Sequence, residues 1–311
     1  MIFLRPNKLA LEKKSRTADH VLTLKTIIDK MFKKKKYLYA CFIDFRKAFD
    51  IVNRQALLFK LRKQYDINGI FFDIIEDMYK DVLFSVKLQN KVTPYFKTSI
   101  GVKQGCVLSP TLFSLYINDI INIFDDTCHP IKLQSGTKVS CLMYADDLVI
   151  VSEEACGLQS ALNNLYTYCN KWDLEINTEK TKIMTFNKTG KTIKKFIFSI
   201  NNTRLENTDS YKYLGIIFKP SGVFTAAVKH LISKAKKATF SIRNIFPQNR
   251  LSFIQNIKLF DACIKPILLY NSEVWGPEII LHDRKSLDKC LLSFMPENIH
   301  IKFIKYILAW C

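Results

Sequence analysis

A four-residue segment between two apolar runs constrains the fold of this chain most strongly. The segment is Tyr144-Ala145-Asp146-Asp147, and the apolar runs are residues 140–143 and 148–151. Two apolar arms joined by turn residues predict a tight β-hairpin that is buried against helices. Adjacent carboxylates at the tip of such a hairpin repel each other, so this interpretation requires a cation beside them. The alternative is a solvated turn, in which a pair of aspartates is common.

A second segment offers a third carboxylate. Residues 37–45 are almost continuously aromatic, β-branched or small and apolar, which predicts an interior strand with Asp44 near its C-terminal end. If this strand lies beside the hairpin, then Asp44, Asp146 and Asp147 converge, although Asp44 and Asp146 are 102 positions apart (146 − 44). Hard divalent cations prefer oxygen ligands. Carboxylates that hold two such ions are the arrangement used for in-line phosphoryl or nucleotidyl transfer.

The charge balance indicates the kind of partner. The chain has 311 residues, enough for a substantial core with one or two subdomains, and its formal net charge is +19. This excess favours a polyanionic partner, with nucleic acid ahead of an anionic membrane surface. The alternative is a generally lysine-rich proteome. We find no apolar run of about 18 residues and no signal-peptide layout, so we expect a soluble, intracellular protein without a membrane segment.

Cysteine and histidine spacing provides no second metal hypothesis. The nine cysteines show no C-x-x-C pair, and most lie in apolar runs, which indicates buried thiols in a reducing compartment. The five histidines are scattered without an H-x-x-x-H pair. The carboxylates therefore remain the only predicted metal ligands.

The first third of the chain shows several helical and strand patterns. A helix ending near the lysine run 33–36 leads into the Asp44 strand, and this run either is solvated or contacts phosphates. Two helices are predicted over 56–79, followed by strands at 82–88 and 95–100 that are joined by a turn at 89–94. The loop 101–110 contains Gly101 and Gly105, and it leads into a helix with Ser109 as N-cap and Pro110 as first helical residue.

The remainder continues the sheet and then becomes helical. A helix over 158–172 and a strand over 183–186 complete a split β-α-β sheet. Residues 211–218 predict one short strand, in which Gly215 marks a bulge or a close backbone approach. Helices are predicted from 225 to 242, from 253 to 270 and over the last residues. The first of them has a basic face, which either tracks phosphates or is ordinarily solvated. This face contains Lys229, Lys234, Lys236, Lys237 and Arg243.

Five of these segments together resemble the ordered palm motifs of reverse transcriptases from non-LTR (LINE-type) retrotransposons. They are Phe42-Ile43-Asp44-Phe45-Arg46-Lys47-Ala48-Phe49-Asp50, residues 101–110, Tyr144-Ala145-Asp146-Asp147, Asn177-Thr178-Glu179-Lys180-Thr181-Lys182 and Tyr213-Leu214-Gly215. The likeness continues through 258–276, which resembles the thumb of such elements, and extends from about residue 13 to the C-terminus.

The resemblance implies an α+β fold: a right-hand polymerase palm, with an antiparallel sheet flanked by helices, a partial fingers region and an α-helical thumb. The implied divisions are a fingers remnant over 1–36, a palm over 37–222 with a fingers-side insertion at about 51–100, and a thumb over 223–311. The rest of the fingers, and the endonuclease that precedes the polymerase in such elements, are expected to be absent from the sequence.

The resemblance also implies the roles of the acidic residues. Asp44 and Asp146 become the main ligands of two Mg²⁺ ions, for which Mn²⁺ is a possible substitute. Asp147 and the backbone carbonyl of Phe45 become further ligands. Lys180 matches the lysine that protonates the leaving pyrophosphate or neutralises its charge.

Further residues match positions around the nucleotide and the primer. Phe49 matches the steric gate, whose ring excludes a ribose 2′-hydroxyl and so selects deoxynucleotides. Gln104 and Gly105 match the pair that lines the nucleotide pocket. Leu214 and Gly215 match the primer grip, where a glycine permits close approach to the primer backbone.

The chain departs from the family pattern at two places. Glu12 stands where the family has an arginine that faces the incoming triphosphate, and Arg5-Pro6 is a substitute only with different spacing. Asn271 stands where glycine is expected, in a segment that we expect to matter for thumb packing.

Three functional hypotheses follow. The first is an RNA-directed DNA polymerase of a retrotransposon, acting in the nucleus or cytoplasm on an RNA template, a DNA primer and deoxynucleotide triphosphates. The second is a catalytically inactive, retroelement-derived remnant that still binds nucleic acid. The third, an RNA-directed RNA polymerase, is disfavoured by Phe49 and by Gln104-Gly105. The sequence predicts no oligomeric state.

Overall fold

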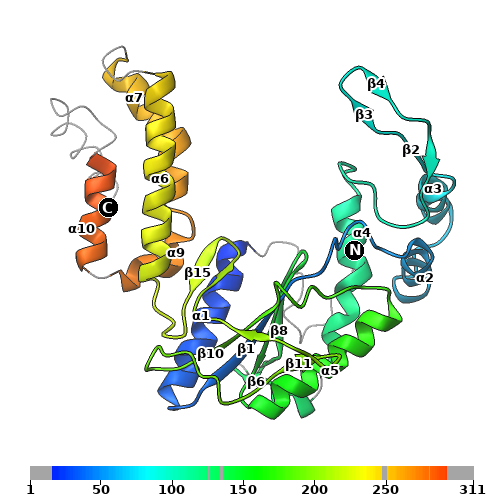
Figure 1. Ribbon diagram of the computed structural model, residues 1–311, viewed down its shortest axis with the longest axis horizontal. Coiled ribbons are helices and arrows are strands. Elements are labelled where there is room, and N and C mark those ends of the chain that lie inside the picture. Colours follow the sequence, from blue (N-terminus) through cyan, green and yellow to red (C-terminus); the bar gives the residue numbers. More distant parts are fainter. Residues whose placement is uncertain (1–15, 125, 134–135, 247–250, 280, 293–311) are drawn as a thin grey trace.

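A five-stranded sheet forms the centre of the molecule, with strand order β13-β10-β1-β9-β8 (Figure 1). The computed structural model describes residues 16–124, 126–133, 136–246, 251–279 and 281–292. The sheet consists of β1 (Leu38–Ile43), β8 (Cys141–Tyr144), β9 (Asp147–Ser152), β10 (Lys182–Phe186) and β13 (Glu206–Asn207). All neighbouring pairs are antiparallel except β10 and β13. The expected α+β fold with an antiparallel sheet is therefore confirmed.

Strand β1 is buried on both faces because helices cover the sheet from two sides. Tyr39, Cys41 and Ile43 point into a core shared with α4 (Ser109–Ile117) and α5 (Ala155–Lys171). The alternate residues of β1 pack into a second core with α1 (Thr17–Lys33) and α6 (Thr225–Ile245). Such two-sided burial explains why β1 is apolar at nearly every position instead of at every second one.

Strands β8 and β9 form the expected acidic hairpin. Tyr144 pairs with Asp147, which leaves a two-residue turn of Ala145 and Asp146. Ala145 adopts a left-handed conformation with φ 53°, which a tight turn demands of its first central residue. Both arms are buried between the two cores, whereas Asp146 and Asp147 remain exposed.

Helices α2 (Arg54–Gln64) and α3 (Ile70–Tyr79) begin one arm of the molecule, and a long, thin hairpin follows them (Figure 1). This hairpin contains β2 (Leu83–Phe84), β3 (Lys87–Leu88), β4 (Lys91–Val92) and β5 (Phe96–Lys97). The predicted turn at 89–94 was too long, because Leu88 already pairs with Lys91 and the chain reverses at Gln89-Asn90. Ser109 is likewise not the N-cap of α4: Leu108 is, and the Ser109 hydroxyl donates to the carbonyl of Lys103.

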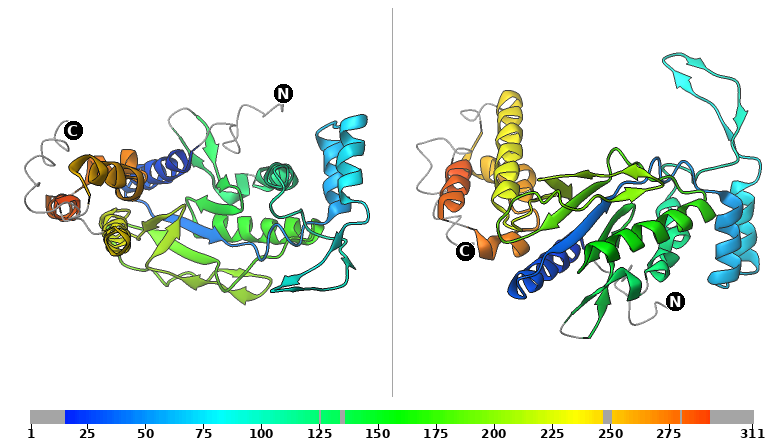
Figure 2. Two further views of the ribbon diagram at one scale, coloured as in Figure 1. Left: turned by 90° about the horizontal axis from the view of Figure 1, so that it is seen from above. Right: turned by 60° about the horizontal axis from the view of Figure 1, so that its bottom comes forward.

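The C-terminal arm is helical, as expected. It contains α6, α7 (Phe253–Leu259), the π-helical segment η4 (Phe260–Ile264), α8 (Lys265–Leu268), α9 (Ser272–Trp275), η5 (Gly276–Glu278) and α10 (Leu281–Leu292). Figures 1 and 2 show the two arms rising from opposite ends of the central sheet. The shorter elements are η1 (Asn118–Ile123), η2 (Asp126–Cys128), β6 (Ile131–Lys132), β7 (Lys138–Val139), β11 (Ser199–Ile200) and β12 (Thr203–Arg204).

Residues 211–218 form a hairpin, not the single strand that the sequence predicted. Its strands are β14 (Tyr211–Tyr213) and β15 (Ile216–Phe218), and Leu214-Gly215 is the turn, with φ 44° and 81°. A Cβ on Gly215 would lie 2.8 Å from Cε1 of Tyr270. The expected close approach therefore exists at Gly215, and its partner in the structure is the ring of Tyr270 in the C-terminal arm.

Several expectations concern single residue types. Of the eight cysteines that the structure describes, Cys41, Cys128, Cys141, Cys169 and Cys290 are buried, as the apolar runs around most of them predicted. The lysine run 33–36 is exposed to solvent. Glu12 and Arg5-Pro6 lie outside the described residues. Within the described part of the chain, no helix combines the length and apolar character needed to cross a membrane.

Candidate active site

The pairing of β1 with β9 brings the three aspartates to one end of the sheet. Ile43, the last residue of β1, lies opposite Leu148 of β9. Asp44 therefore emerges next to Asp147, at the tip of the β8–β9 hairpin. Two segments about a hundred residues apart in sequence thus bring three carboxylates to the same end of the sheet, which is the arrangement that a shared metal site needs.

The electrostatics of this end favour a bound cation. Partial desolvation raises the pKa of Asp147 from 3.8 to about 6, and the charges of Asp146 and Asp44 add to this effect. Among the described residues, no lysine, arginine or histidine makes an ion pair with any of the three. Oxygen donors that repel one another fit a hard divalent cation such as Mg²⁺. The three carboxylates form an open group, because their oxygens do not all lie within 4.8 Å of one another.

A loop between α5 and β10 is fastened to the end of β1. The backbone N–H of Asn177 donates to the carbonyl of Asp44 at 2.8 Å, and the N–H of Asp44 donates to Oγ1 of Thr181 at 3.1 Å. Phe45 forms an isolated β-bridge with Ile176. Lys180, next to Thr181, is exposed beside this junction. The sequence motif assigned no role to Thr181, but in the structure its hydroxyl accepts the hydrogen bond that positions the backbone of Asp44.

The glycine-containing loop 101–108 lies directly against the turn that follows Asp44. The N–H of Gly101 donates to the carbonyl of Val52 at 2.8 Å, and Nε2 of Gln104 donates to Oδ1 of Asp50 at 2.6 Å. Gly101 has φ 81°, and a Cβ there would lie 2.5 Å from the carbonyl oxygen of Asp50. Only glycine permits this contact, which holds Gln104 near the turn. Gly105 has φ 82° and open space around its Cα.

Phe49 lies in the same region, between the turn and helix α4. Its carbonyl accepts a hydrogen bond of 2.9 Å from the N–H of Val102. Its ring packs on Phe113, with 4.4 Å between centroids, and is half-buried. The structure therefore places the turn of Phe49 against the loop that carries Gln104 and Gly105, and Phe113 supports the Phe49 ring from behind.

The β14–β15 hairpin lies over the other face of the sheet. The ring of Tyr211 stacks on Phe42 of β1, with 4.2 Å between centroids and 16° between planes. Burial raises the pKa of Tyr211 to about 12, with further contributions from the charges of Asp147 and Asp44. Tyr211 is thus a neighbour of the carboxylates, and the sequence motifs did not identify it. The available signal was its position two residues before the motif Tyr213-Leu214-Gly215.

The turn of this hairpin faces the C-terminal arm. The carbonyl of Leu214 accepts a hydrogen bond of 3.1 Å from the hydroxyl of Tyr270. Asn271, where glycine was expected, has φ 55° and is buried. Asparagine tolerates this left-handed conformation better than most residues, which explains how it takes the place of glycine.

Helix α1 supports the acidic hairpin from behind. The ring of His20 meets that of Tyr144 edge-on, with centroids 5.4 Å apart. Burial lowers the pKa of His20, although the nearby charge of Asp19 opposes this shift. This contact between His20 and Tyr144 could not be predicted from the sequence.

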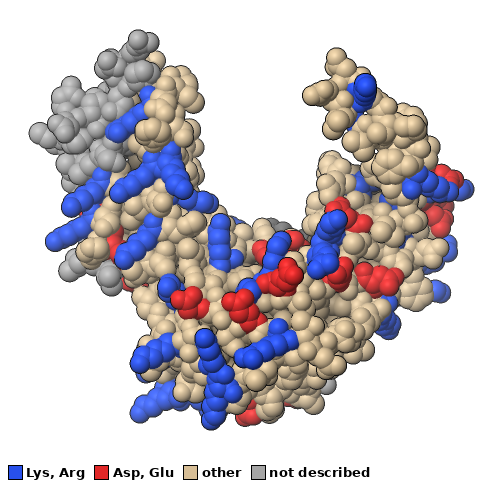
Figure 3. Space-filling view, viewed as in Figure 1, with Lys and Arg blue, Asp and Glu red and all other residues tan. Residues whose placement is uncertain are grey.

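The face of α6 opposite its core contacts carries exposed Lys229, Lys234, Lys236 and Lys237, while Arg243 is half-buried. Figure 3 shows a wide opening between the two arms, with acidic side chains near its floor and basic side chains over the C-terminal arm. A sheet with acids at one hairpin, flanked by helices and by two arms, is the arrangement expected of a right-hand polymerase.

Comparisons with known proteins agree with this arrangement. The family model for reverse transcriptase (RNA-dependent DNA polymerase) matches residues 3–218. The chain therefore belongs to the reverse transcriptase family. It is 28% identical over 250 residues to the RNA-directed DNA polymerase from the mobile element jockey of Drosophila funebris, covering 78% of this chain and 26% of that protein.

Other relatives have similar names. A probable RNA-directed DNA polymerase from transposon BS of Drosophila melanogaster is 26% identical, over 84% of this chain and 29% of the relative. The predicted resemblance to polymerases of non-LTR retrotransposons is thus confirmed. This chain spans between a quarter and a third of the length of these curated relatives.

A solved structure supports the fold. Telomerase from Candida albicans, in complex with a TWJ fragment of telomeric RNA, superposes with a TM-score of 0.52 at 11% identity, over 97% of this chain and 55% of that one. At this identity the likeness concerns the polymerase fold alone.

Proposed function

We propose that this chain is the polymerase part of a retrotransposon RNA-directed DNA polymerase, which extends a DNA primer on an RNA template with deoxynucleotide triphosphates. The observation that carries the proposal is the meeting of Asp44, Asp146 and Asp147 at one end of the sheet, without a basic partner among the described residues. Membership of the reverse transcriptase family supports it.

The carboxylates of Asp44 and Asp146, assisted by Asp147 and the carbonyl of Phe45, would hold two Mg²⁺ ions, with Mn²⁺ as a substitute. When bound, such ions stabilise the charge that develops on the attacking and leaving oxygens. Thr181 and Asn177 position Asp44 through its backbone. Lys180 lies beside this junction and would donate a proton to the departing pyrophosphate, or neutralise it.

The remaining residues would select and orient the substrates. Phe49, supported by Phe113, would present its ring to the 2′-position of the incoming sugar and exclude a hydroxyl. Gln104 and Gly105 would line the base and sugar pocket. The Leu214-Gly215 turn would contact the primer strand, and its anchor on Tyr270 couples it to the C-terminal arm.

The basic face of α6 would hold the template–primer duplex by its phosphates, without reading its sequence. We therefore expect duplex affinity to fall steeply with salt concentration. Such an activity places the protein inside the cell, in the nucleus or the cytoplasm. The division into a fingers remnant over 1–36, a palm and a thumb from about 223 is part of the same proposal.

Primer extension tests this function. Purified full chain should extend a DNA primer on an RNA template with Mg²⁺ or Mn²⁺ and deoxynucleotides. Asp146→Ala should abolish extension, whereas Asp73→Ala, which removes an exposed aspartate on α3, should retain it. Duplex binding without any Asp146-dependent extension would instead support the inactive nucleic-acid-binding remnant. Preferential use of ribonucleotides would support an RNA-directed RNA polymerase.

The Glu12 position has its own test. If Glu12 faces the triphosphate, Glu12→Arg should increase extension and lower the KM for deoxynucleotides, because it replaces repulsion by attraction. An unchanged KM would show that this position does not face the substrate.

A further inference from the structure

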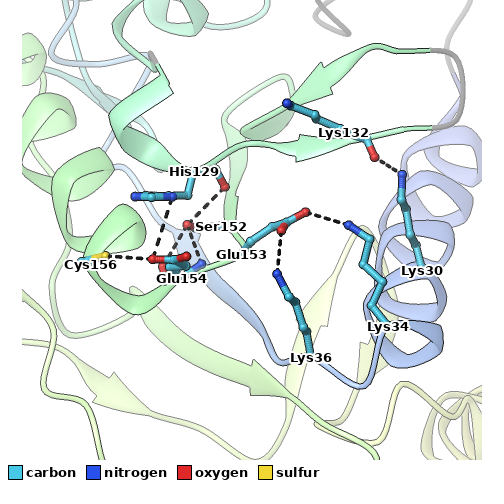
Figure 4. Close-up of polar contacts among 9 residues, drawn as sticks. All are labelled: Lys30, Lys34, Lys36, His129, Lys132, Ser152, Glu153, Glu154 and Cys156. Carbon is cyan, nitrogen blue, oxygen red and sulfur yellow. Dashed lines mark hydrogen bonds and ion pairs between the residues drawn. The ribbon is translucent and has the colours of Figure 1, made fainter.

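We propose that His129, Glu154 and Cys156 form a second metal site, specific for Zn²⁺ or a similar transition metal, at the end of β9 opposite the aspartates. One potential ligand atom from each residue lies within 4.8 Å of the other two. Sγ of Cys156 is 3.5 Å from Oε2 of Glu154, and Nδ1 of His129 is 3.9 Å from the same oxygen. Figure 4 shows the three side chains turned toward one another.

The backbone fixes the two segments that supply these ligands. The carbonyl of His129 accepts a hydrogen bond of 3.1 Å from the N–H of Glu153. The buried hydroxyl of Ser152 has two carbonyl oxygens within hydrogen-bond distance, that of Cys128 at 2.8 Å and that of Glu154 at 2.9 Å, and can donate to either. The segment after η2 is therefore tied to the start of α5 on both sides of the proposed site.

His129 also has an unusual backbone conformation. Its φ is 48°, in the left-handed region that few residues other than glycine adopt. Such conformations cost free energy and are concentrated at functional sites. In Figure 4 the imidazole of His129 points toward Glu154.

Gly157, in the first turn of α5, gives the imidazole its space. A Cβ at this position would lie 2.6 Å from Oγ of Ser152, 2.7 Å from the carbonyl oxygen of Cys128 and 2.8 Å from Cδ2 of His129. A side chain at 157 would therefore force the helix and the segment of Cys128 and His129 apart, or displace Ser152, which ties the two together. The glycine therefore maintains the proposed ligand geometry, although alanine would suit a helix better.

The donor set indicates the class of metal. A thiolate, an imidazole and a carboxylate match Zn²⁺, whereas Mg²⁺ and Ca²⁺ prefer oxygen ligands throughout. Three protein ligands leave one position of a tetrahedral ion for water or an external donor. The site is accessible, because 43% of the His129 side chain and 55% of the Glu154 side chain are exposed.

The proposed site is separate from the aspartates. Strand β9 runs from Asp147 to Ser152, and at about 3.3 Å per residue these five steps (152 − 147) correspond to roughly 17 Å. A metal here would link the segment after η2 to the start of α5 and stabilise the palm, without taking part in nucleotidyl transfer. The inference therefore does not depend on the polymerase proposal.

Cobalt spectroscopy provides the test. The full chain, stripped with a chelator and kept in excess Mg²⁺, should bind one equivalent of Co²⁺ and develop a thiolate-to-cobalt charge-transfer band that Zn²⁺ abolishes. Cys156→Ser should remove the band and weaken Zn²⁺ binding by at least about tenfold. The matched control is Cys263→Ser, which removes another exposed thiol and should change neither property.

Gly157→Ala is the sharpest variant because it keeps all three ligands. We expect it to weaken Zn²⁺ binding and to reduce the rise in melting temperature that Zn²⁺ causes, while circular dichroism in chelator reports an intact fold. His129→Ala and Glu154→Gln should weaken binding as well. The proposal is overturned if the wild type gives no thiolate band, if the band persists in Cys156→Ser, or if folded Gly157→Ala binds Zn²⁺ as tightly as the wild type.

Discussion

The aspartates at one end of strand β9 and Glu153 at its other end differ in whether basic side chains pair with them. At the end that begins with Asp147, partial burial and the neighbouring carboxylates raise the pKa of Asp147, and no ion pair among the described residues compensates these carboxylates. At the other end, Glu153 accepts contacts from Lys34 at 3.3 Å and from Lys36 at 3.5 Å, as Figure 4 shows.

This difference shows which acids the fold neutralises with its own cations. The sequence provides 47 basic residues, so lysine and arginine are not scarce. Leaving three carboxylates without a basic partner costs stability, and such a cost is typical of functional sites. Asp44, Asp146 and Asp147 are therefore the carboxylates that we expect to receive hard cations such as Mg²⁺ from solution.

The largest expected effect is a difference in primer extension between substitutions at the two ends of β9. Asp44→Asn should reduce primer extension by about a thousandfold or more, because it removes a negative charge that the transferring centre requires. Glu153→Gln, at the other end of the same strand, should stay within about twofold of the wild type. The comparison would fail if both substitutions reduced the extension rate equally, with folding checked by circular dichroism.

A smaller effect concerns sugar selection beside Asp44. Phe49→Val should raise the incorporation of ribonucleotides relative to deoxynucleotides by about tenfold or more, because the ring no longer excludes the 2′-hydroxyl. Single-nucleotide kcat/KM values for both substrates measure this ratio. Phe59→Val, at an exposed aromatic ring of α2, is the control. Unchanged selectivity in Phe49→Val would remove Phe49 from this role.

The pH dependence of stability is expected to be moderate. Because the folded-state pKa of Asp147 is raised from 3.8 to about 6, the folded chain binds the proton more tightly than the unfolded chain. This contribution to stability is complete below about pH 4 and is lost as the pH rises through about 6. Since the side chain is exposed, we expect about 1 kcal/mol.

Asp147→Asn should therefore stabilise the metal-free protein at pH 7 and flatten this part of the profile. Urea unfolding in chelator at pH 4 to 8 provides the measurement. If the free energy of unfolding depended more steeply on pH in Asp147→Asn than in the wild type, the raised pKa of Asp147 would not explain the pH dependence.

The smallest effect concerns the paired end. Glu153→Gln should lower the free energy of unfolding by about 0.5 to 1 kcal/mol at low salt, and by less at high salt, because ion pairs with exposed lysines are weak and screened. Lys188→Gln, at an exposed lysine elsewhere in the palm, should change it less. A salt-independent loss would indicate that packing, not charge, is responsible.

Much of the palm could be predicted because its strands and helices follow from residue patterns within short segments of the sequence. The run around Asp44 and the arms of the acidic hairpin are apolar because both faces of the sheet are covered, and the faces of α5 and α6 keep helical spacing. The order of the motifs then predicted that Asp44 and Asp146 meet, which periodicity alone cannot do.

Other features depend on tertiary contacts that leave little trace in the sequence. Residues 211–218 appeared as one strand because Leu214 occupies a left-handed turn position that leucine rarely adopts, and the contact with Tyr270 holds it there. The grouping of His129 with Glu154 and Cys156 was also missed, because the first two are 25 positions apart (154 − 129) and no known ligand spacing marks them. The anchoring of Asp44 by Thr181 likewise appears only when the loop is in place.

Iron-mediated cleavage tests the central claim most directly. Fe²⁺ bound in place of Mg²⁺ generates hydroxyl radicals in the presence of ascorbate and peroxide, and these cut the backbone beside the ion. We expect fragments that end near Asp44 and near Asp146-Asp147, which disappear in excess Mg²⁺ and in Asp146→Asn but persist in Asp73→Asn. Absence of cleavage at these positions, or cleavage that neither Mg²⁺ nor Asp146→Asn affects, would contradict a divalent metal site at this end of β9.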